Sequence, residues 1–335
     1  MNTTETSSSF RKGIATLIET LSAGYNTVLK RIWLIAIPVA LDVYLWVGPR
    51  LSIKPLTRFF LSLWLPIEQA PADIQSFLTF NRQLLETMGQ ETNLFSLLSS
   101  SLLGMPSYLA GGLPEGISGS PVTWGESSSA LTILAIIPPL IAASLFLGSL
   151  YLGAIAQIAR EGTLTVGHLI QRVWRYWGLI LLFGVLLTMV LFILGLPVMM
   201  IIGVLASLSP AMAQFVLLGA GGLVLWMLFH LSFVPHAIVV SESGLLRAVW
   251  NSLIVVGRNF WSALALVVSM NLIKAGFTVV WNRVSVNTLL TAASIAGNAF
   301  IGTGLVAASL IFYRDRMEQW TTWLEQVRSA GEEGE

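Results

Sequence analysis

Few residues of this sequence could carry out chemistry inside a membrane, and Asp42 is the first of them. It lies in the apolar stretch 32–47, and we place no other ionisable side chain well inside an expected span. A carboxylate at that depth is costly, so a role in the path of a proton, an ion or a substrate is the default hypothesis. The alternative is structural: Asp42 lies near the end of a short span, where it is hydrogen-bonded or hydrated.

Residues suited to catalysis or metal binding are sparse elsewhere. The three histidines are His168, His230 and His236. The last two are six residues apart and therefore lie on different faces of a helix, whereas a metal pair prefers adjacent positions. His168 falls on a polar helix face, where we expect it to be solvated.

The sequence also lacks the residue sets of known chemistries. It has no cysteine, no Ser–His–acid set, no phosphate-binding glycine loop and no clustered carboxylates. We therefore predict no catalytic residue, no metal and no cofactor, so the protein is not expected to be an enzyme. A membrane enzyme that acts on a glycerophospholipid stays an open alternative.

The composition identifies the environment of the chain. Of its 335 residues, 55% are hydrophobic and only 10% are charged, and the mean hydropathy is +0.78. Soluble domains carry roughly 25% charged residues, so the sequence predicts an integral membrane protein. The net charge of +1 gives no reason to expect nucleic acid as a partner. No apolar core with a cleavage site follows the polar first ten residues, so we expect no cleaved signal peptide.

Six apolar stretches approach or exceed the roughly 20 residues with which a helix crosses a bilayer. These expected spans are 32–47, 131–158, 178–205, 211–233, 261–280 and 288–312. Prolines 138 and 139 are expected to kink the second span, and Pro197 the third. Most of the 18 lysines and arginines fall on the side of the amino terminus. By the positive-inside rule, both termini face the cytoplasm, and we expect the plasma membrane of a prokaryote.

Three amphipathic stretches each precede a span and indicate an internal repeat. They are 10–33, 164–177 and 241–261, and they end in the basic and aromatic segments KRIW, RVWRYW and GRNFW. In the third stretch the apolar side chains occupy half of the helix, while Arg247 and Asn251 point the other way. We predict an all-α polytopic bundle of about six transmembrane helices in three pseudo-repeats, each introduced by an amphipathic interfacial helix. A chance similarity of pattern is the alternative.

The spans divide the chain into five expected segments. They are a cytoplasmic amphipathic helix at 1–31, a first transmembrane helix at 32–48, an extracytoplasmic loop at 49–129, a five-helix membrane core at 130–313 and a cytoplasmic amphipathic tail at 314–335. Within the loop, 57–68 and 93–105 are expected to lie on the outer membrane surface, and 111–129 is expected to be flexible because it is rich in glycine, proline and serine.

Charged and aromatic residues beside the expected inner surface are candidates for binding anionic lipid headgroups. These candidates are Arg172, Arg175, Arg247, Arg258, Trp174, Trp177 and Trp261. Arginine attracts such headgroups, and tryptophan prefers the interface; a role in topology alone is an equal alternative. Glu161 and Glu242 occupy equivalent places after the second and fourth spans. For them we favour roles in turns or helix caps over pairing with arginines of the next repeat.

The segment FVPHAIVVSESGLLRAVWNSLIVVGRNFW carries the most specific pattern of the chain. Its characteristic positions are Pro235, Glu242, Gly244, Ala248, Ser252, Gly257, Asn259, Phe260 and Trp261. The segment resembles the membrane domain attached to some bacterial glycerophosphoryl diester phosphodiesterases and the uncharacterised six-helix membrane proteins that share it. The resemblance implies a fold and a membrane, and it implies no settled chemistry. The phosphodiesterase barrel needs about 250 residues and has no room here, and the long 49–129 loop departs from the pattern.

These observations favour a non-catalytic scaffold or partner subunit that interacts with another membrane component and with anionic lipid. The missing catalytic sets, the repeated interfacial helices and the resemblance to a fused domain support this hypothesis. The alternative is a transporter or channel for a lipid-like or amphiphilic solute, which the repeat, the prolines within spans and Asp42 support.

Overall fold

The computed structural model describes residues 3–63, 72–99, 103–114, 117, 119–126, 128–285 and 287–332. The chain divides into two compact units. Unit 1 comprises Met1–Thr27, Leu152–Met270 and Leu305–Glu335, and unit 2 comprises Val28–Tyr151 and Asn271–Gly304.

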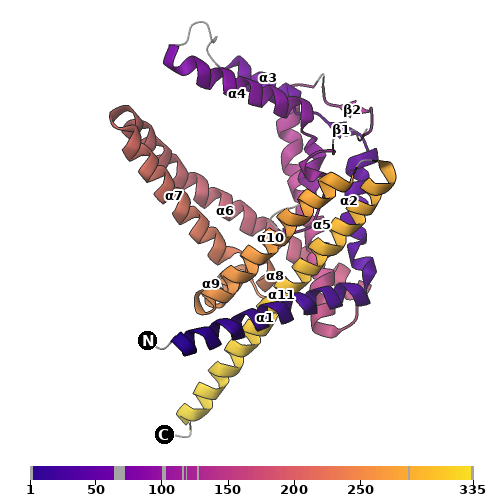
Figure 1. The fold of residues 1–335 in the computed structure, drawn as a ribbon, viewed down its shortest axis with the longest axis vertical. Coiled ribbons are helices and arrows are strands. Elements are labelled where there is room, and N and C mark those ends of the chain that lie inside the picture. Colours follow the sequence, from indigo (N-terminus) through magenta and orange to yellow (C-terminus); the bar gives the residue numbers. More distant parts are fainter. Residues whose placement is uncertain are drawn as a thin grey trace. The chain divides into compact units, whose positions relative to one another are not determined.

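The fold is an all-α polytopic membrane bundle, as the sequence predicts. Five helical segments of the described chain are long and apolar enough to cross a membrane (Figure 1). They are α5 (Ala130–Glu161), α6 (Val166–Leu208), α7 (Pro210–Leu231) with α8 (Val234–Val240), α10 (Phe260–Val284) and α11 (Thr288–Glu332). The first expected span is a shorter apolar segment, made of the 3-10 turn η1 (Ile32–Ile35) and α2 (Ala36–Val47).

Two of the three predicted interfacial helices are separate elements. Helix α1 (Thr3–Lys30) is followed by η1, and α9 (Leu245–Arg258) ends at Asn259 before α10 begins. The Asn259 side chain donates a hydrogen bond to the carbonyl of Val255 (3.1 Å). Because the Asn259 side chain competes with the backbone for this carbonyl, it favours the end of a helix. The GRNFW segment therefore separates α9 from α10.

The predicted break at RVWRYW is wrong. Helix α6 runs without interruption from Val166 to Leu208, through this segment and through Pro197. The buried side chains of its first half recur at helical spacing and are Leu169, Val173, Tyr176, Ile180 and Phe183. One continuous buried stripe requires one continuous helix, so the second amphipathic stretch is the start of a span. Likewise, α11 continues through the expected separate tail.

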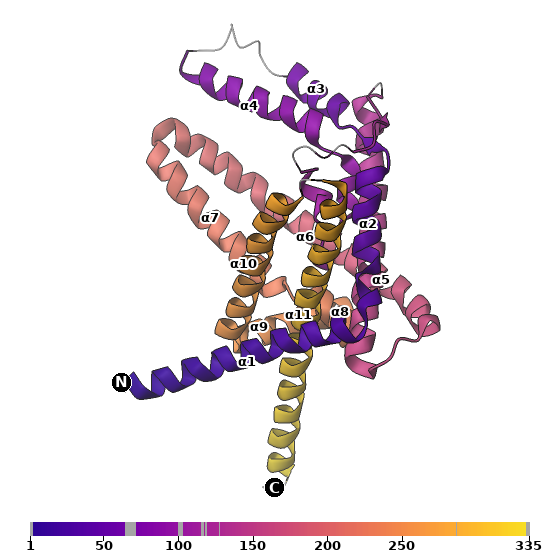
Figure 2. The ribbon, with the colours of Figure 1, turned by 45° about the vertical axis from the view of Figure 1, so that its right-hand side comes forward.

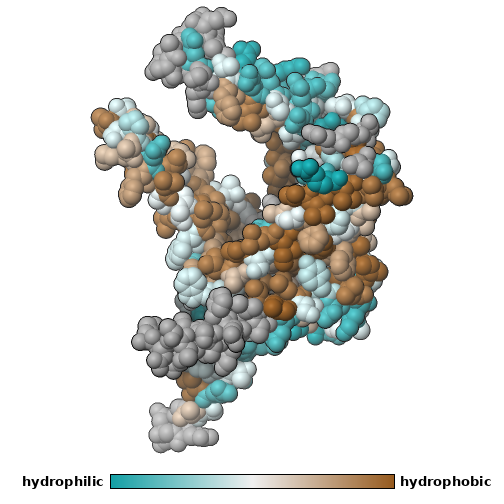
Figure 3. Space-filling view, in the orientation of Figure 1, coloured by the Kyte–Doolittle hydropathy of each residue, from teal (hydrophilic) through white to brown (hydrophobic). Residues whose placement is uncertain are grey.

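Helices α6 and α7 form an antiparallel hairpin within unit 1 (Figures 1 and 2). Beyond Phe183 the half-buried residues of α6 form a single seam, with one residue in every three or four positions. They are Gly184, Leu187, Leu191, Gly195, Val198, Ile202 and Leu205. All other side chains in this part of α6 are exposed and mostly apolar, and Ala213 is the only buried residue of α7. Apolar residues cover much of the hairpin on the face that Figure 3 shows.

The long loop of unit 2 is more ordered than the sequence indicates. Strand β1 (Arg50–Leu51) pairs in parallel with β2 (Thr123–Trp124), which lies in the segment expected to be flexible. Helices α3 (Lys54–Ser62) and α4 (Ala72–Glu91) and the 3-10 turns η3 (Leu94–Leu98) and η5 (Leu109–Gly111) complete the loop. Residues 64–68 and 100–102 of the expected surface segments lie outside the described residues.

A small apolar core holds this loop to the start of α5. It contains Leu51, Ile53, Leu94 and Ile133, all buried. Asn93 fixes the turn beside it, since its side-chain oxygen accepts hydrogen bonds from the backbone N–H groups of Leu51 (2.9 Å) and Phe95 (3.1 Å). Apolar burial and a satisfied backbone together give the segment one conformation.

Close packing at Gly302 predicts a position that does not tolerate a side chain. A Cβ atom added there would overlap Cβ of Pro106, whereas one added at Gly276 would meet nothing within 4 Å. We expect Gly302→Ala to destabilise the protein by about 1–3 kcal/mol, the usual cost of overpacking. Thermal unfolding in detergent micelles measures the effect. Gly276→Ala is the matched control, and equal melting temperatures for the two variants would contradict this packing.

Candidate functional site

Asp42, the sequence candidate for an intramembrane path, is an anchor for the loop of unit 2. Its carboxylate is fully buried and accepts hydrogen bonds from the Ser107 hydroxyl and from the backbone N–H groups of Tyr108 (2.8 Å) and Leu109 (3.1 Å). These N–H groups open the turn η5 and have no partner within it. The structural alternative therefore accounts for Asp42.

The anchor continues to the neighbouring helices through Tyr108. Its hydroxyl lies within hydrogen-bond distance of Asn282 Oδ1 (3.1 Å) on α10 and of Ser285 Oγ (3.0 Å). Ser285 in turn donates to Ser294 Oγ (2.9 Å) on α11. Each buried polar group of this chain of contacts has a partner, so the network fixes the loop and exposes no reactive group.

Glu242 is the centre of a charged cluster in unit 1. Its Oε1 atom lies 2.6 Å from Arg160 Nη1 and 2.7 Å from Arg172 Nη1, and it accepts a hydrogen bond from the Tyr176 hydroxyl (3.1 Å). Glu161 contributes more loosely, at 3.6 Å from Arg172 and 3.8 Å from Arg160. The less favoured reading of these glutamates, pairing with arginines, is the one that the geometry supports.

The capping role predicted for Glu161 and Glu242 does not match the observed helix starts. Helix α6 has Thr165 at its N-cap and α9 has Gly244, and neither residue caps through a side chain. Glu242 lies between α8 and α9, and its φ of 47° is in the left-handed region. A non-glycine residue there costs roughly 1–2 kcal/mol.

Arginines of this cluster also satisfy the carbonyls at helix ends. Arg160 donates to the carbonyl of Val240 at the end of α8 (3.2 Å), and Arg314 donates to the carbonyl of Ala159 near the end of α5. Arg175 donates to the carbonyl of Glu242 (2.9 Å). The last carbonyls of a helix lack partners of their own, so these arginines lock the ends of α5 and α8 in place.

The charges set the protonation of Glu242. Partial burial alone raises the pKa of this carboxyl, but the hydrogen bond from Arg160 and the positive charges of Arg160 and Arg172 outweigh burial and hold the pKa below its usual value. The group is therefore ionised at neutral pH. It acts as a fixed anion that binds arginines. A carboxyl that donates a proton near neutral pH would need a raised pKa.

The predicted lipid-headgroup residues divide into two kinds. Arg172, Arg175 and Arg258 are engaged within the protein: the first two contact Glu242, and Arg258 lies over the Trp320 and Trp323 rings at 4.3 and 4.9 Å. Arg247 is exposed, and no hydrogen bond or ion pair of its side chain occurs in the described chain. Arg247 is therefore the arginine best placed for a headgroup.

The aromatic candidates lie on exposed helix faces. Trp174 follows the exposed Ile170 on α6 and stands edge-on to Trp177 (5.8 Å between ring centres), and Trp261 is 78% exposed. On α9, Leu246 and Trp250 are exposed in the same way. The opposite face of α9 holds Ala248, Asn251 and Ser252, which pack into the protein. Asn251 therefore meets protein, where the sequence suggested water, whereas Arg247 is exposed.

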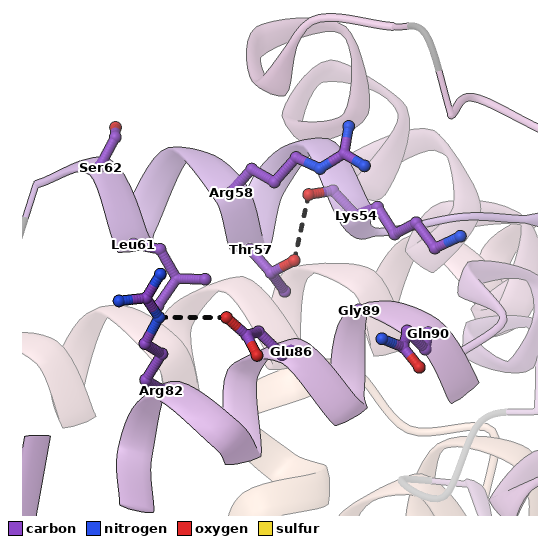
Figure 4. Close-up of a pocket in the computed structure, with 9 residues that line it drawn as sticks. All are labelled: Lys54, Thr57, Arg58, Leu61, Ser62, Arg82, Glu86, Gly89 and Gln90. Carbon is purple, nitrogen blue, oxygen red and sulfur yellow. Dashed lines mark hydrogen bonds and ion pairs between the residues drawn. The ribbon is translucent and has the colours of Figure 1, made fainter. Parts of the chain in front are cut away.

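A groove of about 710 Å³ lies between α3 and α4 in unit 2 (Figure 4). Lys54 and Arg58 border it from α3, and Arg82 and Glu86 rise from α4 toward α3. Sequence reasoning assigned these cations only to the loop. Lys54 pairs with Glu126 (2.8 Å) and Arg82 with Glu86 (3.1 Å), so two of the three cations already have anionic partners. Such exposed pairs are weak and screened by salt.

Lys274 is the residue that sequence reasoning missed. It falls within the expected span 261–280, and the structure places it inside α10, ten residues before the end of that helix. The statement that Asp42 alone is ionisable within a span is therefore wrong. The sequence signal for the position of Lys274 was its distance from Trp261 and Trp281, which flank the apolar part of α10.

The three histidines have different surroundings. His236 Nε2 lies 2.8 Å from Ser309 Oγ, and His230 Nδ1 lies 2.9 Å from the carbonyl of Trp226. No group of three or more potential metal ligands occurs among the residues with described positions. His168 is exposed, as expected.

Comparison with known proteins gives no family for the chain. No family model, no curated protein and no solved structure matches it.

Replacement of Glu242 tests the charged cluster. Glu242→Gln keeps the shape of the side chain and removes its charge, which leaves Arg160 and Arg172 without their anion. We expect a loss of about 1–2 kcal/mol, less than for a fully buried pair because Glu242 is partly solvated. Thermal unfolding at pH 7 measures it, and Glu126→Gln, at an exposed ion pair, is the control.

The stability that the Glu242 cluster contributes depends on pH. The lowered pKa means that the contribution of Glu242 is complete above its ordinary value of 4.5 and is lost as pH falls through the lower pKa of the folded protein. Between pH 7 and pH 3 the difference in stability between the wild type and Glu242→Gln should therefore shrink. A difference that stays constant over this range would contradict the ion-pair account.

Replacement of Asp42 tests the anchor. An asparagine can accept through one oxygen only, so its amide group would face one of the two backbone N–H donors. Leaving a buried donor unsatisfied costs about 1–3 kcal/mol, and we expect Asp42→Asn to lower the melting temperature accordingly. Asp315→Asn, at a partly exposed residue, is the control. Unchanged stability would return Asp42 to the candidates for a transport path.

Proposed function

We propose that this integral membrane protein is a non-catalytic scaffold or partner subunit that holds another membrane component. The α6–α7 hairpin is the observation that carries the proposal. Only a single seam of α6 is even half-buried beyond Phe183, and the remaining surface is apolar and exposed. Such a surface must be covered within the membrane by lipid or by a second protein, and it offers a large area to another transmembrane helix.

The polar groups of the chain support a structural role over a chemical one. Asp42 accepts three hydrogen bonds from its own loop, and Glu242 binds two arginines and a tyrosine of its own unit. Neither carboxylate is poised for proton transfer or for the passage of a solute. The transporter hypothesis thereby loses the residue that motivated it.

Anionic lipid is the second proposed partner. Exposed Arg247 stands beside exposed Leu246 and Trp250 on α9, with Trp261 at the start of α10. An arginine next to apolar and aromatic side chains matches the interface, where headgroups and acyl chains meet. By the positive-inside rule we propose that this region and both termini lie on the cytoplasmic side, and we propose the plasma membrane of a prokaryote as the location. The resemblance to a membrane domain that is fused to other proteins agrees with a partner role.

Native mass spectrometry of the protein released gently from its own membranes tests the proposal. We expect a second membrane protein at fixed stoichiometry together with retained anionic lipid, and less of that lipid on Arg247→Gln. Arg82→Gln, which removes a cation from the α3–α4 groove, is the control. A lone protein that holds one defined solute would contradict the scaffold proposal and favour a transporter.

A further inference from the structure

Lys274 places a cation inside the apolar part of α10. Trp261 and Trp281 lie near the two ends of this helix and are 20 residues apart, or about 30 Å along the axis, which matches the hydrocarbon core. Tryptophan prefers the membrane interface. Lys274 is seven residues from Trp281, about 10 Å from that interface.

The ammonium group has no partner among the residues that the structure describes. Lys274 is half-buried, and over the described ranges its side chain makes no hydrogen bond and no ion pair. Only its backbone carbonyl is engaged, as the acceptor of the Thr278 hydroxyl (2.9 Å). A charged side chain within a span normally pairs with another group or reaches a water-filled space.

The geometry of α10 works against escape to the nearer interface. Side chains of an α-helix lean toward its amino terminus, so Lys274 leans toward Phe260 and away from the Trp281 level. Phe277 and Trp281 lie on the same face and stack with their ring centres 5.7 Å apart. They lie between Lys274 and the carboxyl end of α10, which is the nearer interface. Trp281 is held there because its ring fits against Gly297 of α11.

The expected spans of a second copy offer one carboxylate at membrane depth. It is Asp42, and it is enclosed by Ser107, Tyr108 and Leu109. A second copy would present the same enclosed group. The anion must therefore come from a different chain or from a lipid.

We propose that Lys274 receives a carboxylate from a transmembrane helix of a different membrane protein. The side chains next to it on the exposed side, Ala275 and Thr278, are small and permit close approach of a second helix. Beyond them Leu272 and Val279 are exposed and apolar, so a helix that brings an aspartate or glutamate would bury them. This inference rests on the proposed partner function and assigns that partner a contact.

Photocrosslinking from position 275 in intact cells tests the contact. A photoreactive amino acid at Ala275 should join to one transmembrane segment that carries an aspartate or glutamate within two helical turns of the crosslink. Lys274→Gln should reduce this adduct at least tenfold, whereas Lys274→Arg should retain it. The same probe at the exposed Leu218 of α7 is the positional control.

An exchange of charge between Lys274 and the partner carboxylate completes the test. It also distinguishes a failure of this contact from a failure of the proposed function. Lysine in place of the partner carboxylate should abolish the adduct, and Lys274→Glu in the same cells should restore it. Adducts to lipid only, or an adduct unchanged by Lys274→Gln in a variant that elutes and melts like the wild type, would overturn the inference. A partner that stays bound in native mass spectra of Lys274→Gln would leave the scaffold proposal standing; no partner at all would overturn both.

Discussion

The carboxylate of Glu242 is the interaction on which unit 1 depends. Helices that cross a membrane satisfy their own backbone within the span, but their ends leave carbonyls that need donors. Arg160 and Arg175 supply such donors to Val240 and to Glu242 itself. These arginines need an anion to stay partly buried, and Glu242 provides it from a turn that would otherwise be strained. One side chain thus joins α5, α6 and the α8–α9 turn.

Unit 2 uses a carboxylate in the same way, and Lys274 is the exception. Asp42 satisfies the backbone of the loop that returns to α2. In both units a carboxylate organises the protein's own chain. Lys274 makes no hydrogen bond or ion pair among the described residues, and we propose for it a contact with another molecule.

The sequence predicts the spans well because hydropathy and length decide whether a helix crosses a bilayer. It also predicts α9, whose periodicity is strong and whose end is marked by Asn259. It fails at Tyr176, where a buried stripe continues across the expected hinge and keeps α6 in one piece. A composition-based prediction of flexibility likewise misses β2, whose partner is β1, more than 70 residues earlier.

Contacts between residues distant in the sequence explain why the site was predicted only in part. Glu242 was identified from its place after a span, but its binding to Arg160, 82 residues earlier, depends on how the helices pack. Asp42 was singled out for its charge, while its partners at 107–109 lie in a loop with no sequence signal for pairing. Lys274 was missed although the expected span 261–280 contains it, because its charge was counted with the outer segments.

A double-mutant cycle between Glu242 and Arg172 tests the central claim most directly. Stability would be measured for the wild type, Glu242→Gln, Arg172→Gln and the double variant, with the exposed pair Arg82 and Glu86 as a reference cycle. The account predicts a coupling energy of about 1 kcal/mol for the first pair, which is partly exposed, and less than about 0.5 kcal/mol for the exposed pair. Additive effects at Glu242 and Arg172 would show that this carboxylate does not hold the helices together.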